Sequence, residues 1–143
     1  LAFALLRRLG LDAVAAEQLY RRMAFNVVAR NQDDHVKNVA FAMGRDGAWR
    51  LAPAYDLTWA YRPGNRWLHA HQMTINGKRD DFTVEDLRAV ARFAGLKRGR
   101  GEAILREVAD VVAAWPAFAD EVGVDERLRD AAAASHRLSL PRR

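Results

Sequence analysis

The chain has 143 residues and a formal net charge of +5, and half of its residues are hydrophobic. This composition is that of a globular domain and argues against a disordered chain. The absence of cysteine excludes disulfides and thiolate metal sites. No apolar run approaches the roughly 20 residues of a membrane span, and no signal-peptide layout is present, so we expect a cytoplasmic protein.

The positive charge comes mainly from arginine, since lysine occurs only at positions 37, 78 and 97. Such an excess could attract nucleotides, nucleic acid or an acidic protein, but its even spread does not select one of them. The sequence also begins at Leu1, already inside a helical pattern. We therefore expect the chain to be the C-terminal part of a longer protein.

The first part of the chain predicts two helices. Residues 1–9 are expected to form the end of a helix, which Gly10 is suited to close. Asp12 can cap a second helix, which we expect to end near residues 30–31. Apolar residues at helical spacing give this second helix one buried face: Tyr20, Met23, Ala24, Val27 and Val28.

The next part predicts a loop followed by a hairpin. Residues 31–38 are polar and have no amphipathic period, which indicates a loop. Short apolar runs at 39–43 and 48–52 flank a turn sequence that contains Gly and Asp, which is typical of a β-hairpin. Pro53 ends the second strand, and we expect irregular structure from residue 57 to 81.

The last part predicts three more helices. The first opens with a capping box at Thr83 and stops at Gly95. A longer helix begins near Arg100, and Pro116 ends or kinks it. Its apolar face comprises Ile104, Val108, Val111, Val112 and Trp115. A final helix is expected over 125–138, so the whole chain is predicted to be one mainly α domain with a small hairpin.

Four polar residues around the predicted hairpin are suited to phosphoryl transfer from a nucleotide. Asp33, His35 and Asn38 lie in the loop, and Asp56 follows the hairpin. In this reaction one carboxylate accepts or orients the proton of the attacking hydroxyl, while an amide and a second carboxylate hold Mg²⁺ against the phosphates. One Asp and one Asn suffice, because Mg²⁺ keeps several waters. A hairpin folds back on itself, so we expect Asp56 to lie beside Asn38.

Structural interpretations of the same residues are also open. Asp33 and Asp34 could simply close a helix end. His69 and His71 have the spacing of two ligands on a strand, but without cysteine or a nearby carboxylate we do not expect zinc there. The four tryptophans do not alternate with a basic stripe, so we expect them in the core or a peptide groove rather than in a base-stacking platform.

Several segments together resemble one family. An Asp-x-His-x-x-Asn loop, a hairpin and then a metal-binding Asp are typical of the protein-kinase-like superfamily outside the standard protein kinases. Residues 25–28 (FNVV), 31–38 (NQDDHVKN), 51–57 (LAPAYDL) and 75–78 (INGK) resemble the HipA serine/threonine kinase toxins. The resemblance covers about residues 1–115. It implies a protein-kinase-like C-terminal lobe, mainly α, with a small β-hairpin after the catalytic loop.

The resemblance implies a role for each residue of the loop and for Asp56. Asp33 matches the catalytic aspartate, and Asn38 matches the magnesium-binding asparagine. Asp56 stands in the place of the second metal-binding aspartate, here within Tyr-Asp-Leu. His35 replaces a lysine of the standard kinases and is expected to order the loop or to neutralise the transferring phosphate. Lys37 is a candidate phosphate contact. The implied cofactors are ATP and Mg²⁺.

The resemblance also implies partner proteins and a nucleotide-binding part that this sequence does not contain. The sequence has no Gly-rich phosphate loop and no Val-Ala-x-Lys strand, so the nucleotide clamp is expected ahead of Leu1. The isolated chain is therefore expected to be inactive. The family pairs with a small helix-turn-helix antitoxin and phosphorylates a protein substrate linked to translation. We thus expect DNA contact only through the antitoxin, and no contact with membranes.

Two alternatives stay open. A small-molecule phosphotransferase of the aminoglycoside-kinase or lipid-kinase type shares Asp33, His35 and Asn38, although residues 54–57 and 75–78 argue against it. The second alternative is a truncated lobe that only binds a partner. The late start of the chain favours this second alternative, and the intact set of Asp and Asn residues argues against it.

Overall fold

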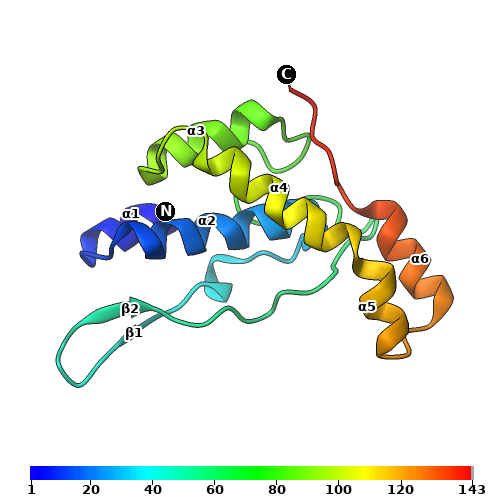
Figure 1. Cartoon of the computed structure of the whole chain (residues 1–143), viewed down its shortest axis with the longest axis horizontal. Helices are drawn as coiled ribbons and strands as arrows, with labels where there is room; N and C mark the ends of the chain where they lie inside the picture. The colour runs from blue at the N-terminus through cyan, green and yellow to red at the C-terminus, as the bar shows by residue number, and fades with distance from the viewer. Residues whose placement is uncertain (143) are drawn as a thin grey trace.

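The computed structural model describes residues 1–142 and is mainly helical (Figure 1). These residues form α1 (Ala2–Arg8), α2 (Ala13–Val28), the 3-10 turn η1 (Val36–Asn38), β1 (Phe41–Met43), β2 (Trp49–Leu51), α3 (Val84–Ala94), α4 (Arg100–Ala113), α5 (Trp115–Glu121) and α6 (Glu126–Ser135). The prediction of a mainly α fold with one small hairpin is confirmed. Within the described residues, no helix combines the length and apolar character that crossing a membrane requires.

Helix α2 lies at the centre of the fold and packs against α3 and α4 (Figure 1). The predicted apolar face of α2 enters the core, except that Met23 is only partly buried. The buried side chains contributed by the three helices are Tyr20, Ala24, Val27, Val28, Leu87, Ala91, Ile104, Val108 and Val112. Burial of a large apolar side chain such as Leu87 or Ile104 contributes about 1.5–3 kcal/mol each, so this core holds the three helices together.

A glycine allows the close approach of α4 to its two neighbours. A Cβ atom at Gly101 would lie 2.7 Å from the Cβ of Ala91 on α3 and 3.1 Å from the hydroxyl oxygen of Tyr20 on α2. The Tyr20 hydroxyl in turn donates a hydrogen bond to the Leu87 carbonyl at 3.2 Å. Burial raises the pKa of Tyr20, so this hydroxyl stays a neutral donor. The missing side chain at position 101 therefore fixes how tightly the helices pack.

The predicted helix ends are confirmed where a side chain or a glycine defines them. The Asp12 carboxylate accepts a hydrogen bond from the Ala15 N–H at 2.9 Å and caps α2. Thr83 and Asp86 form a capping box with both reciprocal hydrogen bonds at the start of α3. Gly95 ends α3 with a φ of 77°, in the left-handed region that glycine adopts without strain.

Three predictions about the later helices are wrong. Val111 is 59% exposed, because it lines an open groove together with Trp115 and Phe118. Trp115, predicted on the same face, is instead the first residue of a separate helix, α5. The prediction that Pro116 ends or kinks the long helix is confirmed, because α4 ends just before it and Pro116 lies in the first turn of α5, where its missing N–H removes no helical hydrogen bond. The last helix ends at Ser135, three residues earlier than expected.

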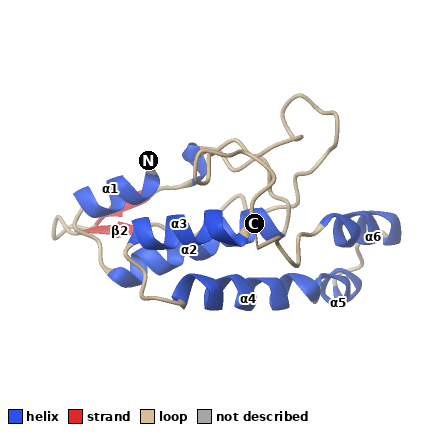
Figure 2. Ribbon diagram, turned by 90° about the horizontal axis from the view of Figure 1, so that it is seen from above, coloured by secondary structure: helices blue, strands red, loops and turns tan. Residues whose placement is uncertain are grey.

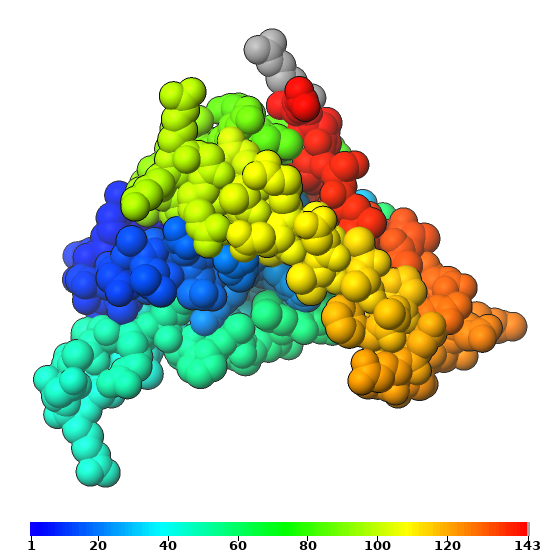
Figure 3. Space-filling view, viewed as in Figure 1, coloured from blue at the N-terminus to red at the C-terminus, as the bar shows by residue number. Residues whose placement is uncertain are grey.

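The hairpin and the chain that follows it lie on the side of α2 away from α4 (Figure 2). Strands β1 and β2 pair antiparallel with Phe41 opposite Leu51, and each has three residues where five were predicted. The hairpin projects from one corner of the molecule, and α5 with α6 forms another (Figure 3). The segment from 57 to 81 contains no helix and no named strand, as predicted, and a bridge between Asn31 and Ala60 ties it to the loop after α2.

Candidate active site

The loop after α2 begins with a tight reversal. Arg30 has a φ of 58°, and the Asn31 N–H donates to the Asn26 carbonyl at 2.9 Å. The Gln32 N–H donates to the Ala60 carbonyl at 3.0 Å, and the Ala60 N–H donates to the Arg30 carbonyl at 3.1 Å. The start of the loop is thus tied both to the end of α2 and to the segment that follows the hairpin.

The side chain of Asn31 joins this loop to Asp56. Asn31 is 1% exposed, and its Nδ2 donates to Asn26 Oδ1 at 3.0 Å and to the Asp56 carbonyl at 3.1 Å. Asp56 has a φ of 55°, a left-handed conformation that few residues other than glycine adopt. The hydrogen bond from Asn31 holds Asp56 in this conformation. Aspartate adopts this conformation more readily than most residues other than glycine, and Arg30, Asn76 and Asp81 share it.

Asn38 brings Asp33 and Asp56 together. Its amide nitrogen lies 2.6 Å from Asp56 Oδ2 and 3.1 Å from the backbone carbonyl oxygen of Asp33. Turn η1 places Asn38 there, because the Asn38 N–H donates to the His35 carbonyl at 2.9 Å. The proximity of Asn38 and Asp56 that the chain path predicts is therefore present. The contact lies at the surface of the molecule and not inside a closed pocket.

Asp33 and His35 form a pair on the same turn. His35 Nε2 lies 3.0 Å from Asp33 Oδ1, and 46% of the Asp33 side chain remains exposed. The imidazole therefore orients the carboxylate without covering it. Lys37 is exposed beside them, and its carbonyl accepts a hydrogen bond from the Tyr55 hydroxyl. This contact helps to hold the residue that precedes Asp56.

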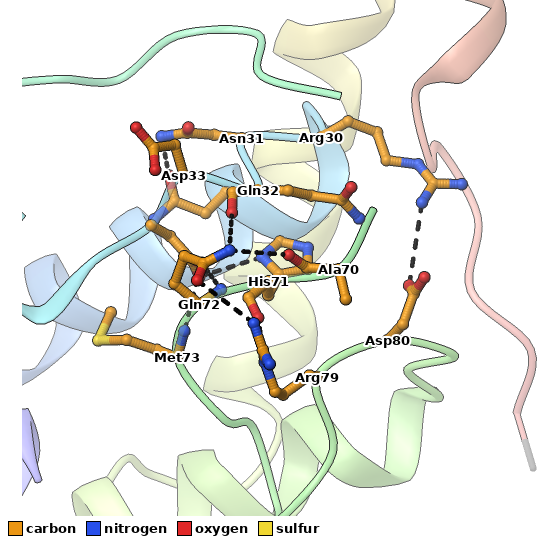
Figure 4. A network of polar contacts seen from close by, with 12 residues as sticks. Arg30, Asn31, Gln32, Asp33, Ala70, His71, Gln72, Met73, Arg79 and Asp80 are labelled. Carbon is orange, nitrogen blue, oxygen red and sulfur yellow. Dashed lines mark hydrogen bonds and ion pairs between the residues drawn. The ribbon is translucent and has the colours of Figure 1, made fainter. Parts of the chain in front are cut away.

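Sequence reasoning missed the role of Asp34, which points inward and does not cap a helix. Asp34 is 4% exposed, and its Oδ2 lies 3.0 Å from Nδ1 of the fully buried His71. Its Oδ1 accepts the backbone N–H groups of Gln72 at 2.7 Å and Met73 at 3.4 Å. Figure 4 shows His71, Gln72 and Met73 beside the part of the loop that carries Asp33. Since 37 positions separate Asp34 from His71, no local spacing reveals the pair.

The histidines and tryptophans outside the loop have separate partners. His69 Nδ1 lies 2.9 Å from the Asn65 carbonyl oxygen, whereas His71 faces Asp34. Two of the tryptophans hold the C-terminal part of the chain, because Trp59 donates to Ser135 Oγ at 2.8 Å and Trp115 to the Arg129 carbonyl at 3.0 Å. The other two tryptophans, at positions 49 and 67, are exposed.

The donor set around Asn38 fits Mg²⁺. Asp56 offers carboxylate oxygens. Asn38 would offer its amide oxygen only after a rotation of about 180°, which replaces its hydrogen bonds to Asp56 and to the Asp33 carbonyl. Mg²⁺ binds hard oxygen ligands and keeps several waters, so two protein side chains are enough. From residue 1 to residue 142 the structure contains no group of three or more His, Asp or Glu side chains arranged to hold a metal.

Comparison with known families identifies the chain. The family model described as "HipA-like C-terminal domain" matches residues 1–115. The matched region runs from α1 through α4 and includes the loop, the hairpin and Asp56. It confirms the resemblance found in the sequence motifs, over the same residues. The searches of curated proteins and of solved structures gave no match. Because the family match covers most of its length, the chain belongs to the family of HipA-like C-terminal domains.

Proposed function

We propose that this domain carries the catalytic loop of a HipA-type toxin kinase, which transfers the γ-phosphoryl group of ATP to a serine or threonine hydroxyl of a protein. The main support is the Asn38 amide, which lies 3.1 Å from the Asp33 carbonyl oxygen and 2.6 Å from the Asp56 carboxylate. Phosphoryl transfer needs a group that handles the hydroxyl proton close to a group that binds the metal. In this structure the Asn38 amide places the Asp33 backbone near the Asp56 carboxylate. When the amide oxygen binds Mg²⁺, the metal would take the place of its hydrogen bond to Asp56.

In the proposed reaction Asp33 orients the attacking hydroxyl and accepts its proton. The hydroxyl oxygen bonds to the γ-phosphorus, the bond from that phosphorus to the β–γ bridging oxygen breaks, and ADP leaves. Because the transition state is loose, orientation matters more than strong basicity. His35 lies 3.0 Å from the Asp33 carboxylate and is suited to provide that orientation.

Asn38 and Asp56 are proposed to hold Mg²⁺, which neutralises phosphate charge when bound. The Asn31 side chain holds the backbone carbonyl of Asp56, so the residue that carries the carboxylate is fixed in place. Lys37, exposed on the same turn as Asn38, is proposed to contact the phosphates.

The resemblance to HipA toxins extends the proposal to partners. We infer a protein substrate linked to translation and a small helix-turn-helix antitoxin that binds operator DNA, so that the domain itself contacts DNA only indirectly. We place this activity in the cytoplasm and away from membranes. The sequence holds no Gly-rich phosphate loop, so a segment other than residues 1–143 is proposed to clamp the nucleotide.

The test is phosphoryl transfer from radiolabelled ATP by the natural polypeptide that contains this chain. Asp33→Asn and Asp56→Asn should each lower the rate by about 100-fold or more. Asp110→Asn, at an exposed position of α4, is the matched control and should leave the rate unchanged. Full activity in both site variants would contradict the proposal and favour a domain that only binds a partner. Transfer to an aminoglycoside or a lipid headgroup, but to no protein, would favour a small-molecule phosphotransferase.

A further inference from the structure

The segment after α6 returns to the end of α2, although it lies outside the family match over residues 1–115. The Arg137 N–H donates to the Val28 carbonyl at 2.8 Å, in the last turn of α2. The Ser135 carbonyl accepts a hydrogen bond from Arg30 Nε at 3.0 Å. The segment is therefore fixed against the start of the loop that carries Asp33.

The guanidinium of Arg137 contacts the buried ring of His71. Arg137 Nη1 lies 3.3 Å from His71 Nε2, and the Arg137 side chain is only 12% exposed. The Nη2 atom of the same guanidinium pairs with Asp80. Phe82 packs against both partners: its centroid lies 5.5 Å from the guanidinium carbon of Arg137 and 5.1 Å from the centroid of the His71 ring. These contacts leave Arg137 and His71 little freedom to move.

The contact with Arg137 determines where the His71 ring carries its proton. A guanidinium can only donate hydrogen bonds, so His71 Nε2 has to accept and carries no hydrogen. The proton is then on Nδ1, which donates to Asp34 Oδ2 at 3.0 Å. Burial, together with the nearby charge of Arg30, lowers the pKa of Arg137 to about 10. Arg137 still stays charged near pH 7, so it remains a donor there.

Asp34, which accepts the His71 hydrogen bond, is itself fixed in place next to Asp33. While Oδ2 of Asp34 accepts from His71, Oδ1 accepts the Gln72 N–H at 2.7 Å and the Met73 N–H at 3.4 Å. The carboxylate is buried, so it cannot turn without leaving donors unpaired away from water. The backbone at Asp33 is thus anchored one residue away.

We propose that Arg137 is a positioning residue for the Asp33 loop, because it keeps His71 in the Nδ1–H form and His71 keeps Asp34 in place. Arg137 acts through these two residues and touches no reacting atom. The consequence for activity rests on the function proposed above. The consequence for the His71 proton does not, so the two can be tested separately.

The first test reads the His71 tautomer from the imidazole ¹⁵N shifts of the whole chain by NMR. We expect a protonated Nδ1 and an unprotonated Nε2. Arg137→Met removes the donor and keeps the bulk, so it should replace this pattern by a mixture of forms. It should also speed the solvent exchange of the Gln72 N–H by about tenfold or more. Arg127→Met, at an exposed position of α6, is the matched control and should change neither signal.

Arg137→Gln keeps an N–H donor, so the Gln72 N–H should exchange more slowly in it than in Arg137→Met. If Arg137→Met fails to fold, the ¹⁵N shifts and the Gln72 exchange of Arg137→Gln provide the test instead. A protonated Nε2 in the unchanged chain would overturn the proposal. Equal Gln72 exchange in the folded Arg137 variant and in Arg127→Met would overturn it as well.

The second test uses the natural polypeptide and separates turnover from nucleotide binding. Arg137→Met should lower kcat by about tenfold and leave KM for ATP within about twofold, because Asn38 and Asp56 keep their own contacts. A changed tautomer with unchanged kcat would overturn the positioning role. If Arg137→Met changes the His71 tautomer but the unmodified polypeptide has no kinase activity, the proposed function is refuted, while the anchoring of the loop remains supported.

Discussion

Asp33 and Asp56 carry the same carboxylate group in different surroundings. The Asp33 side chain is half exposed and is paired with the imidazole of His35. The Asp56 carboxylate accepts the Asn38 amide, and the Asp56 backbone has a left-handed conformation. The first environment leaves room for a hydroxyl group, whereas the second provides neighbouring oxygens for a metal. Substitution of the two residues should therefore have different consequences.

In the natural polypeptide, Asp33→Ala should leave the affinity for Mg²⁺–ATP nearly unchanged and lower turnover by about 10²–10⁴-fold, because its interaction matters mainly in the transition state. Asp56→Ala should weaken Mg²⁺–ATP binding as well as turnover, because the metal bridges the phosphates in the ground state too. Nucleotide titration and radiolabel transfer on both variants measure the difference. Loss of binding in Asp33→Ala with retention in Asp56→Ala would mean that the roles are reversed.

At the level of elements, the contact of α4 with α2 and α3 depends on Gly101. Replacing a helical glycine by alanine at an open position stabilises a helix by roughly 0.5–1 kcal/mol. Here the new methyl group would lie 2.7 Å from the Ala91 Cβ, so α4 has to shift. We expect Gly101→Ala to destabilise the domain by about 1–3 kcal/mol, measured by urea denaturation. A gain in stability would show that the packing at this crossing is loose.

The capping box of α3 predicts how stability changes with pH. Burial alone would raise the pKa of Asp86, but hydrogen bonds from Lys78, Asn76 and Thr83 hold it well below its ordinary value. The folded pKa is lower than the unfolded one, so the stabilisation is present above the unfolded value of about 3.9 and is lost as pH falls through the folded pKa.

Asp86→Asn should therefore lower the free energy of unfolding at pH 7 and flatten the loss of stability below about pH 4. Urea denaturation at pH 7 and at pH 3 measures both effects. Asp110→Asn, which changes an exposed aspartate of α4, serves as the control and should follow the unchanged chain at both pH values. If the free energy of unfolding of Asp86→Asn fell between pH 7 and pH 3 as much as that of the unchanged chain, another carboxylate would dominate acid unfolding.

The sequence predicts correctly those elements whose ends are marked by residues close by in the chain. Asp12, Thr83 and Gly95 mark helix ends correctly, because a cap acts within three or four residues. The hairpin explains why Asn38 and Asp56 meet, since two short antiparallel strands return the chain to its start. The exposure of Val111 could not be predicted in this way, because it depends on whether another element covers that side of α4.

The link from Asp34 through His71 to Arg137 could not be predicted either. Its members are separated by 37 and 66 positions, and each one alone resembles an ordinary polar residue. The family motifs point to the loop itself, and the support behind the loop appears only once the chain is folded.

At the level of the whole molecule, residues 1–143 contain the proposed metal ligands but no Gly-rich phosphate loop. Two oxygen ligands at an exposed surface do not enclose a nucleotide. We therefore expect isothermal titration calorimetry of this chain alone to show no ATP–Mg²⁺ binding in the low-micromolar range. Binding of that strength would mean that the domain holds the nucleotide without a separate clamp.

The hydrogen bond from Arg30 to Ser135 joins residues 105 positions apart, and Arg137 contacts Val28 beside it. A ribosome makes the chain from its N-terminus at about 5–20 residues per second, so the partner of Arg30 appears roughly 5–20 seconds later. During that interval α2 and the hairpin have emerged, but the Asp33 loop lacks its support from Arg137. The loop is therefore completed only after α6 has been made, and a ribosome that stalls within α6 leaves the loop unsupported.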